Sequence, residues 1–320
     1  MNSIAKRLLH AFVLILCSLP LHAGITATKD GNNLRIAIDG KLFTEYRTDK
    51  SVPCLYPLMS ADGTHLTRRF PFEKNIAGEQ YDHPHHIGFW FTHGDVNGSD
   101  FWHGGKDGSK ILTNRFVGEP IIEETEPGTS SLTFTVDLEW LAKGKNPILS
   151  EQRTYKIQTS GTNRTIEVTC DLKAINGDVI FGDTKEGSFA IRVAPTIRNK
   201  GEVAKGRIIT SEGLTAENAW GKRADWVAFH GPDSAGNPTV IAIMDHSENL
   251  RNPTWWHARD YGLLAANPFG ALGFKDKDFK GGGNFTLKNG ESLKQQYLLV
   301  LHQGDLTSAK LDGAWAKFNK

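Results

Sequence analysis

Hydrophobic and polar residues alternate along the middle of the chain. From Leu132 to Trp140 every second residue is apolar, and the residues between them, such as Thr133 and Asp137, are polar. Successive side chains of a β-strand point to opposite faces, so this pattern predicts a strand with one dry and one wet face. Five runs between turn-forming residues are expected as strands: Ile111–Val117, Ile121–Glu124, Leu132–Trp140, Glu151–Ile157 and Arg164–Lys173. This rhythm is typical of an antiparallel sandwich.

The segments before and after this region also have the pattern of β-strands. Leu34–Ile38 and Lys41–Arg47 flank Asp39-Gly40, which is a hairpin signature, and Ser292–Leu301 reads as a late strand. Near the C-terminus, Ser308 is a possible cap for an amphipathic helix. Its apolar stripe would pack on the sheet and comprises Leu311, Ala314, Trp315 and Phe318. We therefore predict an all-β protein with few helices and one short C-terminal helix.

The first 23 residues have the features of a cleavable signal peptide. Lys6 and Arg7 precede the apolar run from Leu8 to Leu16, and Ala23 is the small residue expected before a cleavage point. The net charge of +1 becomes −1 once these two cations are removed, so nothing basic remains to attract nucleic acid or anionic lipid. We expect a secreted or periplasmic protein that does not bind a membrane after cleavage. Residues 24–320 are expected to form one domain.

Two cysteines follow this segment, Cys54 and Cys170. They could pair in an oxidising compartment, but a disulfide needs closely approaching Cα atoms, which the sequence does not reveal.

The stretch from Tyr81 to His103 carries an unusual density of chemistry. It holds five of the chain's 12 histidines, three aspartates and two tryptophans, more than a folded core requires. The glycines and Asx residues around Asp95, Asn97 and Asp100 are typical of turns, so these polar residues are expected on a loop at the sheet edge.

In an extended conformation, His83 and His85 would share one face, with Cα atoms roughly 6.6 Å apart, and His86 would face the other side. That spacing suits a two-imidazole metal chelate, although a catalytic metal needs a third ligand. His93 would lie about 26 Å from His85 unless the chain bends at Gly88.

Two later stretches hold further candidates. Glu186 and Arg192 would lie about 20 Å apart on a straight strand, which makes direct pairing unexpected. His257 and Arg259 alternate along the chain and could project together into a cleft walled by Trp255. Aromatic faces beside polar groups are typical of sugar sites, although an ordinary tryptophan core explains the same residues.

Together these stretches resemble a known family. Asp82–His86 followed by Phe91–Trp102, then Glu186-Gly187 with Ile191–Val193, then His257–Gly262 with Ala266–Gly270, look like the secreted bacterial family called "methane oxygenase PmoA"-like. The resemblance covers most of the chain after residue 23. It implies a β-supersandwich similar to galactose mutarotases, in a family associated with sugar-degrading and sugar-oxidoreductase genes.

Our first hypothesis is a carbohydrate-active enzyme, of the epimerase, lyase or glycoside-cleaving type, that acts on a sugar or keto-sugar by acid–base chemistry. The candidate catalytic residues are His83, His85, His93, Glu186, His257 and Asp260. The candidate substrate-binding residues are Arg68, Trp90, Asp95, Asn97, Arg192, Trp255 and Arg259. One divalent metal on His83 and His85 could assist by polarisation. The alternatives are a non-catalytic carbohydrate-binding protein and a copper or iron oxygenase. The partner would be a small-molecule or oligosaccharide substrate.

Overall fold

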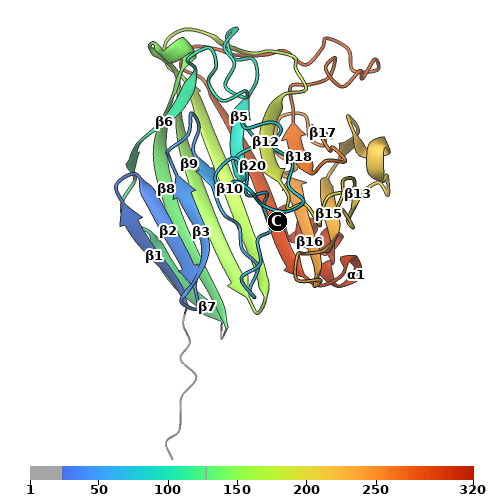
Figure 1. Cartoon of the computed structure of the whole chain (residues 1–320). Coiled ribbons are helices and arrows are strands. Elements are labelled where there is room, and N and C mark those ends of the chain that lie inside the picture. The colour runs from blue at the N-terminus through green and yellow to red at the C-terminus, as the bar shows by residue number, and fades with distance from the viewer. Residues whose placement is uncertain (1–23, 127) are drawn as a thin grey trace, which may run out of the picture.

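The computed structural model describes residues 24–126 and 128–320, and its strands form two large antiparallel sheets that face each other (Figure 1). In spatial order, sheet one consists of β1 (Ile25–Asp30), β2 (Asn33–Ile38), β3 (Lys41–Arg47), β4 (Cys54–Leu55), β5 (Phe89–His93), β12 (Gly187–Arg192), β18 (Leu263–Asn267), β17 (Thr254–Trp256) and β14 (Arg223–Ala224).

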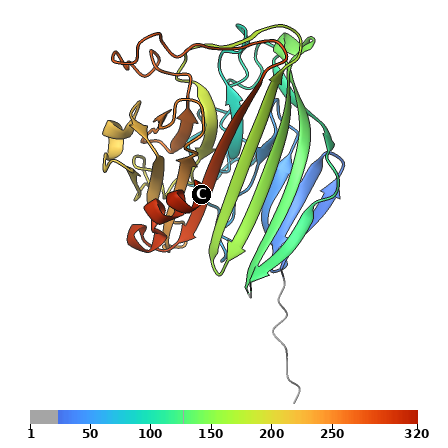
Figure 2. The ribbon, with the colours of Figure 1, turned by 180° about the vertical axis from the view of Figure 1, so that it is seen from behind.

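Sheet two is built from the longest strands, which stand out when the molecule is viewed from behind (Figure 2). Its order is β13 (Arg207–Thr210), β15 (Trp226–Pro232), β16 (Pro238–Asp245), β20 (Ser292–Gln303), β10 (Asn163–Ala174), β9 (Pro147–Ser160), β8 (Thr129–Leu141) and β6 (Lys110–Phe116), with β7 (Ile121–Glu126) also paired to β8. A small third sheet joins β11 (Val179–Phe181) to β19 (Phe285–Leu287).

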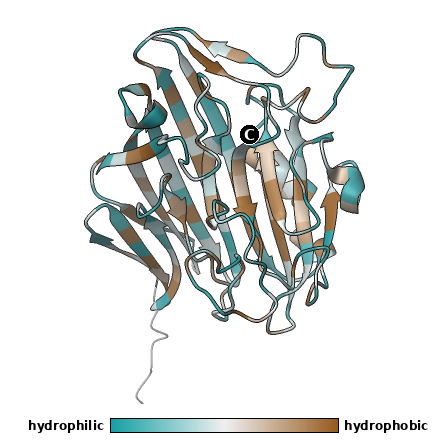
Figure 3. Ribbon diagram, turned by 45° about the horizontal axis from the view of Figure 1, so that its top comes forward, coloured by the Kyte–Doolittle hydropathy of each residue, from teal (hydrophilic) through white to brown (hydrophobic). Residues whose placement is uncertain are grey.

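The predicted all-β antiparallel supersandwich is confirmed. Each of the eight predicted strands coincides with an observed one, and the residues of β8 alternate between buried and partly exposed as expected. Hydropathy alternates along many strands in Figure 3. This two-residue period gives each strand an apolar face that it can bury against the opposite sheet.

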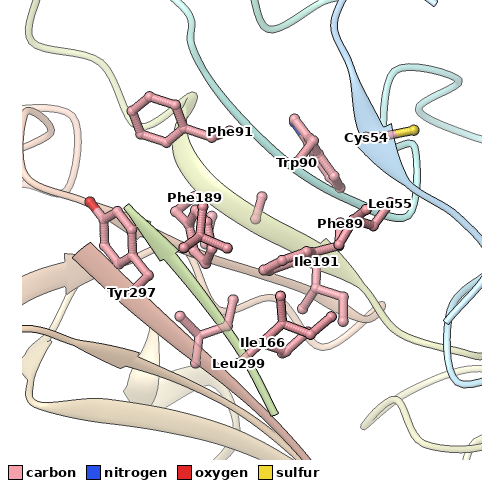
Figure 4. Close-up of a cluster of buried hydrophobic side chains, with 14 of the residues drawn as sticks. Cys54, Leu55, Phe89, Trp90, Phe91, Ile166, Phe189, Ile191, Tyr297 and Leu299 are labelled. Atoms are coloured by element: carbon pink, nitrogen blue, oxygen red, sulfur yellow. The ribbon is translucent and has the colours of Figure 1, made fainter. Parts of the chain in front are cut away.

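The core between the sheets is dominated by aromatic and branched side chains. Phe189 of β12 stacks on Tyr297 of β20 with ring centroids 4.3 Å apart, and Ile191 lies close to Ile166 and Leu299 (Figure 4). Phe91 of β5 also contacts Tyr297, at 6.4 Å. Trp90, between Phe89 and Phe91, must point to the opposite face of sheet one. That face carries the candidate site.

One ion pair is buried inside this sandwich. The guanidinium of Arg153 donates to both carboxylate oxygens of Glu151, at 2.6 and 2.8 Å, and neither side chain is exposed. The indole of Trp140 donates to the same carboxylate at 2.7 Å. These bonds satisfy the charges that burial removes from water.

The helices are short. Two 3₁₀ turns, η1 (Ala142–Gly144) and η2 (Ala216–Ala219), precede α1 (Leu306–Ala309) and α2 (Leu311–Phe318). The predicted stripe of α2 does pack on sheet two, where Leu311 is buried with Trp226 and Met244. The predicted cap is wrong, because Ser308 lies inside α1. The side chain of Asp305 caps that turn by accepting the N–H of Ser308 at 2.8 Å.

Three further expectations concern the signal peptide, binding to membranes and the two cysteines. The predicted signal peptide, residues 1–23, falls outside the described residues. Within them, no helix is long and apolar enough to cross a membrane. Cys54 and Cys170 are both buried and are not paired with each other. Strands β4 and β10, which carry these cysteines, belong to different sheets.

Candidate functional site

The histidine stretch begins as a turn and not as a strand. His83 has a positive φ of 45°, and the N–H of His86 donates to the carbonyl of His83 at 3.0 Å. The rings of His83 and His86 therefore stack with centroids 4.8 Å apart, and the ring of His85 lies 4.5 Å from that of His86. The prediction that His86 points away from the other two is wrong, because it assumed an extended backbone.

Two buried arginines hold this turn in place. Arg68, only 1% exposed, donates to Asp82 Oδ1 at 2.8 Å and to backbone carbonyls, including that of His83 at 2.7 Å. Arg192, fully buried, donates to the same Asp82 oxygen at 3.1 Å and to His86 Nδ1 at 2.9 Å. Arg68 and Arg192 were predicted to bind substrate. The structure places both inside the protein, where they fix the histidine turn.

The guanidinium of Arg192 also sets the proton state of His86. Since a guanidinium only donates, His86 Nδ1 must accept. Burial, reinforced by the positive charge of Arg192, lowers the pKa of His86 well below its usual range. His86 is therefore a neutral ring at physiological pH.

A second loop brings His103 to the same cluster. Asp100 Oδ1 accepts the backbone N–H groups of Trp102 and His103, at 2.9 and 3.0 Å. Asp100 Oδ2 lies 2.7 Å from His103 Nδ1, so the carboxylate accepts from Nδ1–H and orients the ring. The His103 ring centroid is 4.8 Å from that of His85. Sequence reasoning missed His103, although the Asp-x-x-His spacing was a usable signal.

His85 and His103 line a pocket of about 260 Å³. Its wall is formed by Lys50, Ser51, Val52, Pro84, His85, Ile87, Trp102, His103, Gly104 and Lys106. Two buried polar atoms of lining residues have no hydrogen-bond partner among the described residues: His85 Nε2 and Trp102 Nε1. Burial, followed by the charges of His103 and His83, lowers the pKa of His85 to about 4. His85 is thus a neutral imidazole in the wall of the pocket.

Aromatic rings pack against the histidine cluster. Trp90 of β5 stacks on His86 with centroids 5.6 Å apart, and Tyr261 stacks on His83 at 5.2 Å. The guanidinium groups of Arg192 and Arg259 lie 4.5 and 5.5 Å from the Tyr261 ring. Trp90 therefore contacts the site as a supporting wall.

Glu186 acts on the cluster through its charge. The carboxylate of Glu186 forms an ion pair with Lys185 and exerts an electrostatic effect on His85, His103 and His257. Burial lowers the pKa of His257 to about 4 although the charge of Glu186 opposes this shift. His257 Nδ1 is buried without a partner among the described atoms. The expectation that Glu186 does not pair with Arg192 is confirmed, since Arg192 pairs with Asp82.

Three other candidates serve the fold. His93 is buried, its Nε2 lies 2.8 Å from the carbonyl oxygen of Gly182, and its ring packs on Phe269 at 4.9 Å. Asp95 accepts the N–H of Gly98 within its own turn, at 3.0 Å. The side chain of Asn97 accepts the N–H of Ile180 at 2.7 Å and so ties the loop to β11. The loop itself was predicted correctly.

Trp255 and Asp260 also lie apart from the histidine cluster. Trp255 is fully buried, donates to Asp276 at 2.9 Å and packs on Phe279 at 4.8 Å, as an ordinary core tryptophan does. The carboxylate of Asp260 lies 3.9 Å from Lys200 Nζ.

A catalytic metal site would need three converging ligands from the described residues. Among them, no group of three or more His, Cys, Asp or Glu side chains converges in a way that could hold a metal ion. The rings of His83 and His85 lie 5.6 Å apart. The two-ligand metal site stays a prediction.

Comparisons with known proteins place the chain in a family without assigning its activity. A family model described as "Family of unknown function (DUF6807)" matches residues 33–316, and this description does not mention methane oxygenase. No curated protein matches.

Among solved structures, the GH36 α-galactosidase AgaB from Geobacillus stearothermophilus is 10% identical, with a TM-score of 0.43; the match covers 89% of this chain and 42% of that one. A putative aldose 1-epimerase from Escherichia coli K12 is 12% identical, with a TM-score of 0.28, over 87% of this chain and 99% of that one. A galactose mutarotase related enzyme from Lactobacillus acidophilus is 11% identical, with a TM-score of 0.28, over 88% and 98%. The chain spans less than half the length of the α-galactosidase.

Proposed function

We propose that this chain, which belongs to the family of unknown function DUF6807, is a secreted or periplasmic carbohydrate-active enzyme that transfers a proton through His103. The observation that carries the proposal is that His103 and His85 lie in the wall of one pocket, while Asp100, behind His103, holds its ring by a hydrogen bond. An aspartate that orients an imidazole beside a pocket is a common arrangement for general acid–base chemistry.

The two histidines have different roles in this proposal. His103 gives its Nδ1 proton to the hydrogen bond with Asp100, so the lone pair of Nε2 is free to accept a proton from a substrate. Asp100 and the nearby charge of Glu186 stabilise the imidazolium that results. His85, with its pKa lowered to about 4, stays neutral and holds the substrate by a hydrogen bond. An epimerase, a lyase and a glycoside-cleaving enzyme each need such a proton transfer.

A small sugar unit is the substrate that the pocket favours. Its volume of about 260 Å³ is below the roughly 300–1,000 Å³ of pockets for drug-sized ligands, so it suits one monosaccharide unit better than a chain. Trp102 supplies an aromatic wall, and Ser51 supplies a hydroxyl. An apolar ring face combined with hydrogen-bonding groups is what a sugar ring requires.

The test is turnover of a panel of monosaccharides and glycosides, followed by nuclear magnetic resonance for epimerised, eliminated or cleaved products. We expect His103→Gln to lower kcat by about 10²- to 10⁴-fold and Asp100→Asn to lower it as well, because the ring loses its orientation. His230→Gln is the matched control, since His230 is half-buried on β15 of sheet two.

Unchanged turnover in His103→Gln would refute the assignment. Binding of a sugar without any product, by the wild-type protein and by both variants, would favour a carbohydrate-binding protein.

A further inference from the structure

The walls of the site pocket carry positive charge without a matching negative one. Lys50 and Lys106 line it together with His85 and His103, and no lining residue is an aspartate or glutamate. The whole sequence, by contrast, has a net charge of only +1. The pocket is therefore a local concentration of cations on a nearly neutral protein.

The carboxylates nearest to these lysines are already engaged. Asp49 Oδ2 lies 3.9 Å from Lys50 Nζ, but both oxygens of Asp49 accept shorter bonds from Arg47, at 2.9 and 3.0 Å. The two oxygens of Asp107 accept the backbone N–H groups of Asp100 and Ser109, both at 2.9 Å. Each carboxylate thus already has partners other than the pocket lysines.

The carboxylate of the neighbouring loop, that of Asp100, is also already hydrogen-bonded. Asp100 uses one oxygen for backbone N–H groups and the other for His103. Lys106 and Lys50 are both exposed, and Lys50 Nζ lies 5.0 Å from the centre of the Phe72 ring. Both ammonium groups stand on flexible stems, so a ligand in the pocket can draw them toward it. The charge of Lys106 reaches the interior of the site, since it is one of the groups that disfavour a proton on His85.

From these observations we infer that the pocket takes a sugar that carries an anionic group, and that Lys50 and Lys106 bind that group. The inference rests on the proposed function, because it names the substrate class of the same site. A carboxylate at C6 and a phosphate ester at C6 share the chemistry that two ammonium groups recognise. The hydroxyls of the same sugar would be left to Ser51 and His85.

The experiment is isothermal titration calorimetry of the purified protein with glucuronate, glucose 6-phosphate and glucose. These three probes share a ring and differ in the group at C6. We expect at least one anionic sugar to bind roughly tenfold or more tightly than glucose, because hydrogen bonds to charged groups are stronger than neutral ones. The preference should shrink as salt rises from 0.15 M to 0.5 M, through screening of exposed charges.

Variants assign the preference to the two lysines. Lys50→Gln with Lys106→Gln should reduce the affinity ratio of anion to glucose to about one while the affinity for glucose is kept. Lys173→Gln is the control, since Lys173 is an exposed lysine on β10 of sheet two. Whether glucuronate, glucose 6-phosphate or both are preferred identifies the anionic group, and each of these results supports the inference.

Equal affinity for all three sugars, absence of binding by all three, or a preference that survives in the double lysine variant would overturn the inference. Failure of the proposed function is read separately, from turnover in His103→Gln. An anion preference with no role for His103 would therefore leave this inference standing while removing the proposed chemistry.

Discussion

Replacing Asp82 by asparagine isolates the charge that holds the histidine turn. The substitution keeps the shape of the side chain and removes the negative charge that lies between Arg68 and Arg192. Both guanidinium groups are at most 1% exposed, so each would keep its positive charge inside the protein without a counter-ion. Leaving one partner of a buried pair uncompensated costs about 3–5 kcal/mol.

Two features of the site reduce that figure. The Asp82 side chain is 39% exposed, so water already screens part of its charge. Arg68 also keeps its bonds to backbone carbonyls in the variant. We therefore expect a loss of about 2 kcal/mol in the free energy of unfolding, which is roughly a 30-fold change in the folding equilibrium.

The pH dependence gives a second readout. Burial raises the pKa of Asp82, but the charges of Arg192, His83 and Arg68 outweigh it and lower the pKa overall. A depressed carboxyl pKa stabilises the fold above the unfolded value of about 3.9, and this stability is lost as the pH falls through the folded value. The gap between wild type and Asp82→Asn should be constant from about pH 6 to 8 and should close in acid.

The assay is urea unfolding followed by circular dichroism at several pH values. Glu119→Gln is the control, because Glu119 pairs with Lys29 at 2.9 Å but is 85% exposed, and we expect no change in its midpoint. A loss below about 0.5 kcal/mol in Asp82→Asn, or a gap that stays constant down to pH 2, would show that the two arginines do not depend on this carboxylate.

Two further predictions concern other charged groups. In a nuclear magnetic resonance titration, the His85 imidazole should titrate near pH 4. The stability that its neutral form contributes should be lost as the pH falls from about 6.5 to about 4, because the unfolded chain binds the proton more tightly in that range. A titration midpoint near 6.5 would contradict the described burial. Glu151→Gln should lower the free energy of unfolding by about 3–5 kcal/mol, because it leaves Arg153 fully buried without its counter-charge; a loss below about 1 kcal/mol in urea unfolding would mean that water reaches this guanidinium.

The sheets were predictable because successive side chains of a strand point to opposite faces, so that apolar and polar residues alternate along the sequence. β8 is the clearest case, since its buried and partly exposed residues follow the alternation between Leu132 and Trp140. The same rule failed at His83, where the backbone has a positive φ and the side-chain period no longer applies. A turn conformation depends on what the loop packs against, and that information lies elsewhere in the chain.

The arginines illustrate this dependence on distant partners. Arg192 contacts an aspartate 110 positions away, so nothing near it in the sequence indicates that it is buried and paired. As long as its counter-ion is unknown, such an arginine is easily interpreted as a residue that binds a ligand. Ser308 failed for a smaller reason, because Asp305, three residues earlier, is an equally good cap and closes the preceding turn.

The residues that fix the histidine turn differ from those that line the pocket, and this difference bears on how such a protein could diverge. The residues that fix the histidine turn, Asp82 with its two arginines, are tied to strands or to backbone atoms, and a change in any of them disturbs the fold. The lysines at positions 50 and 106 are exposed loop residues of the pocket wall and can be exchanged at little cost to stability. Selection could therefore alter what enters the pocket while the histidine turn keeps its position.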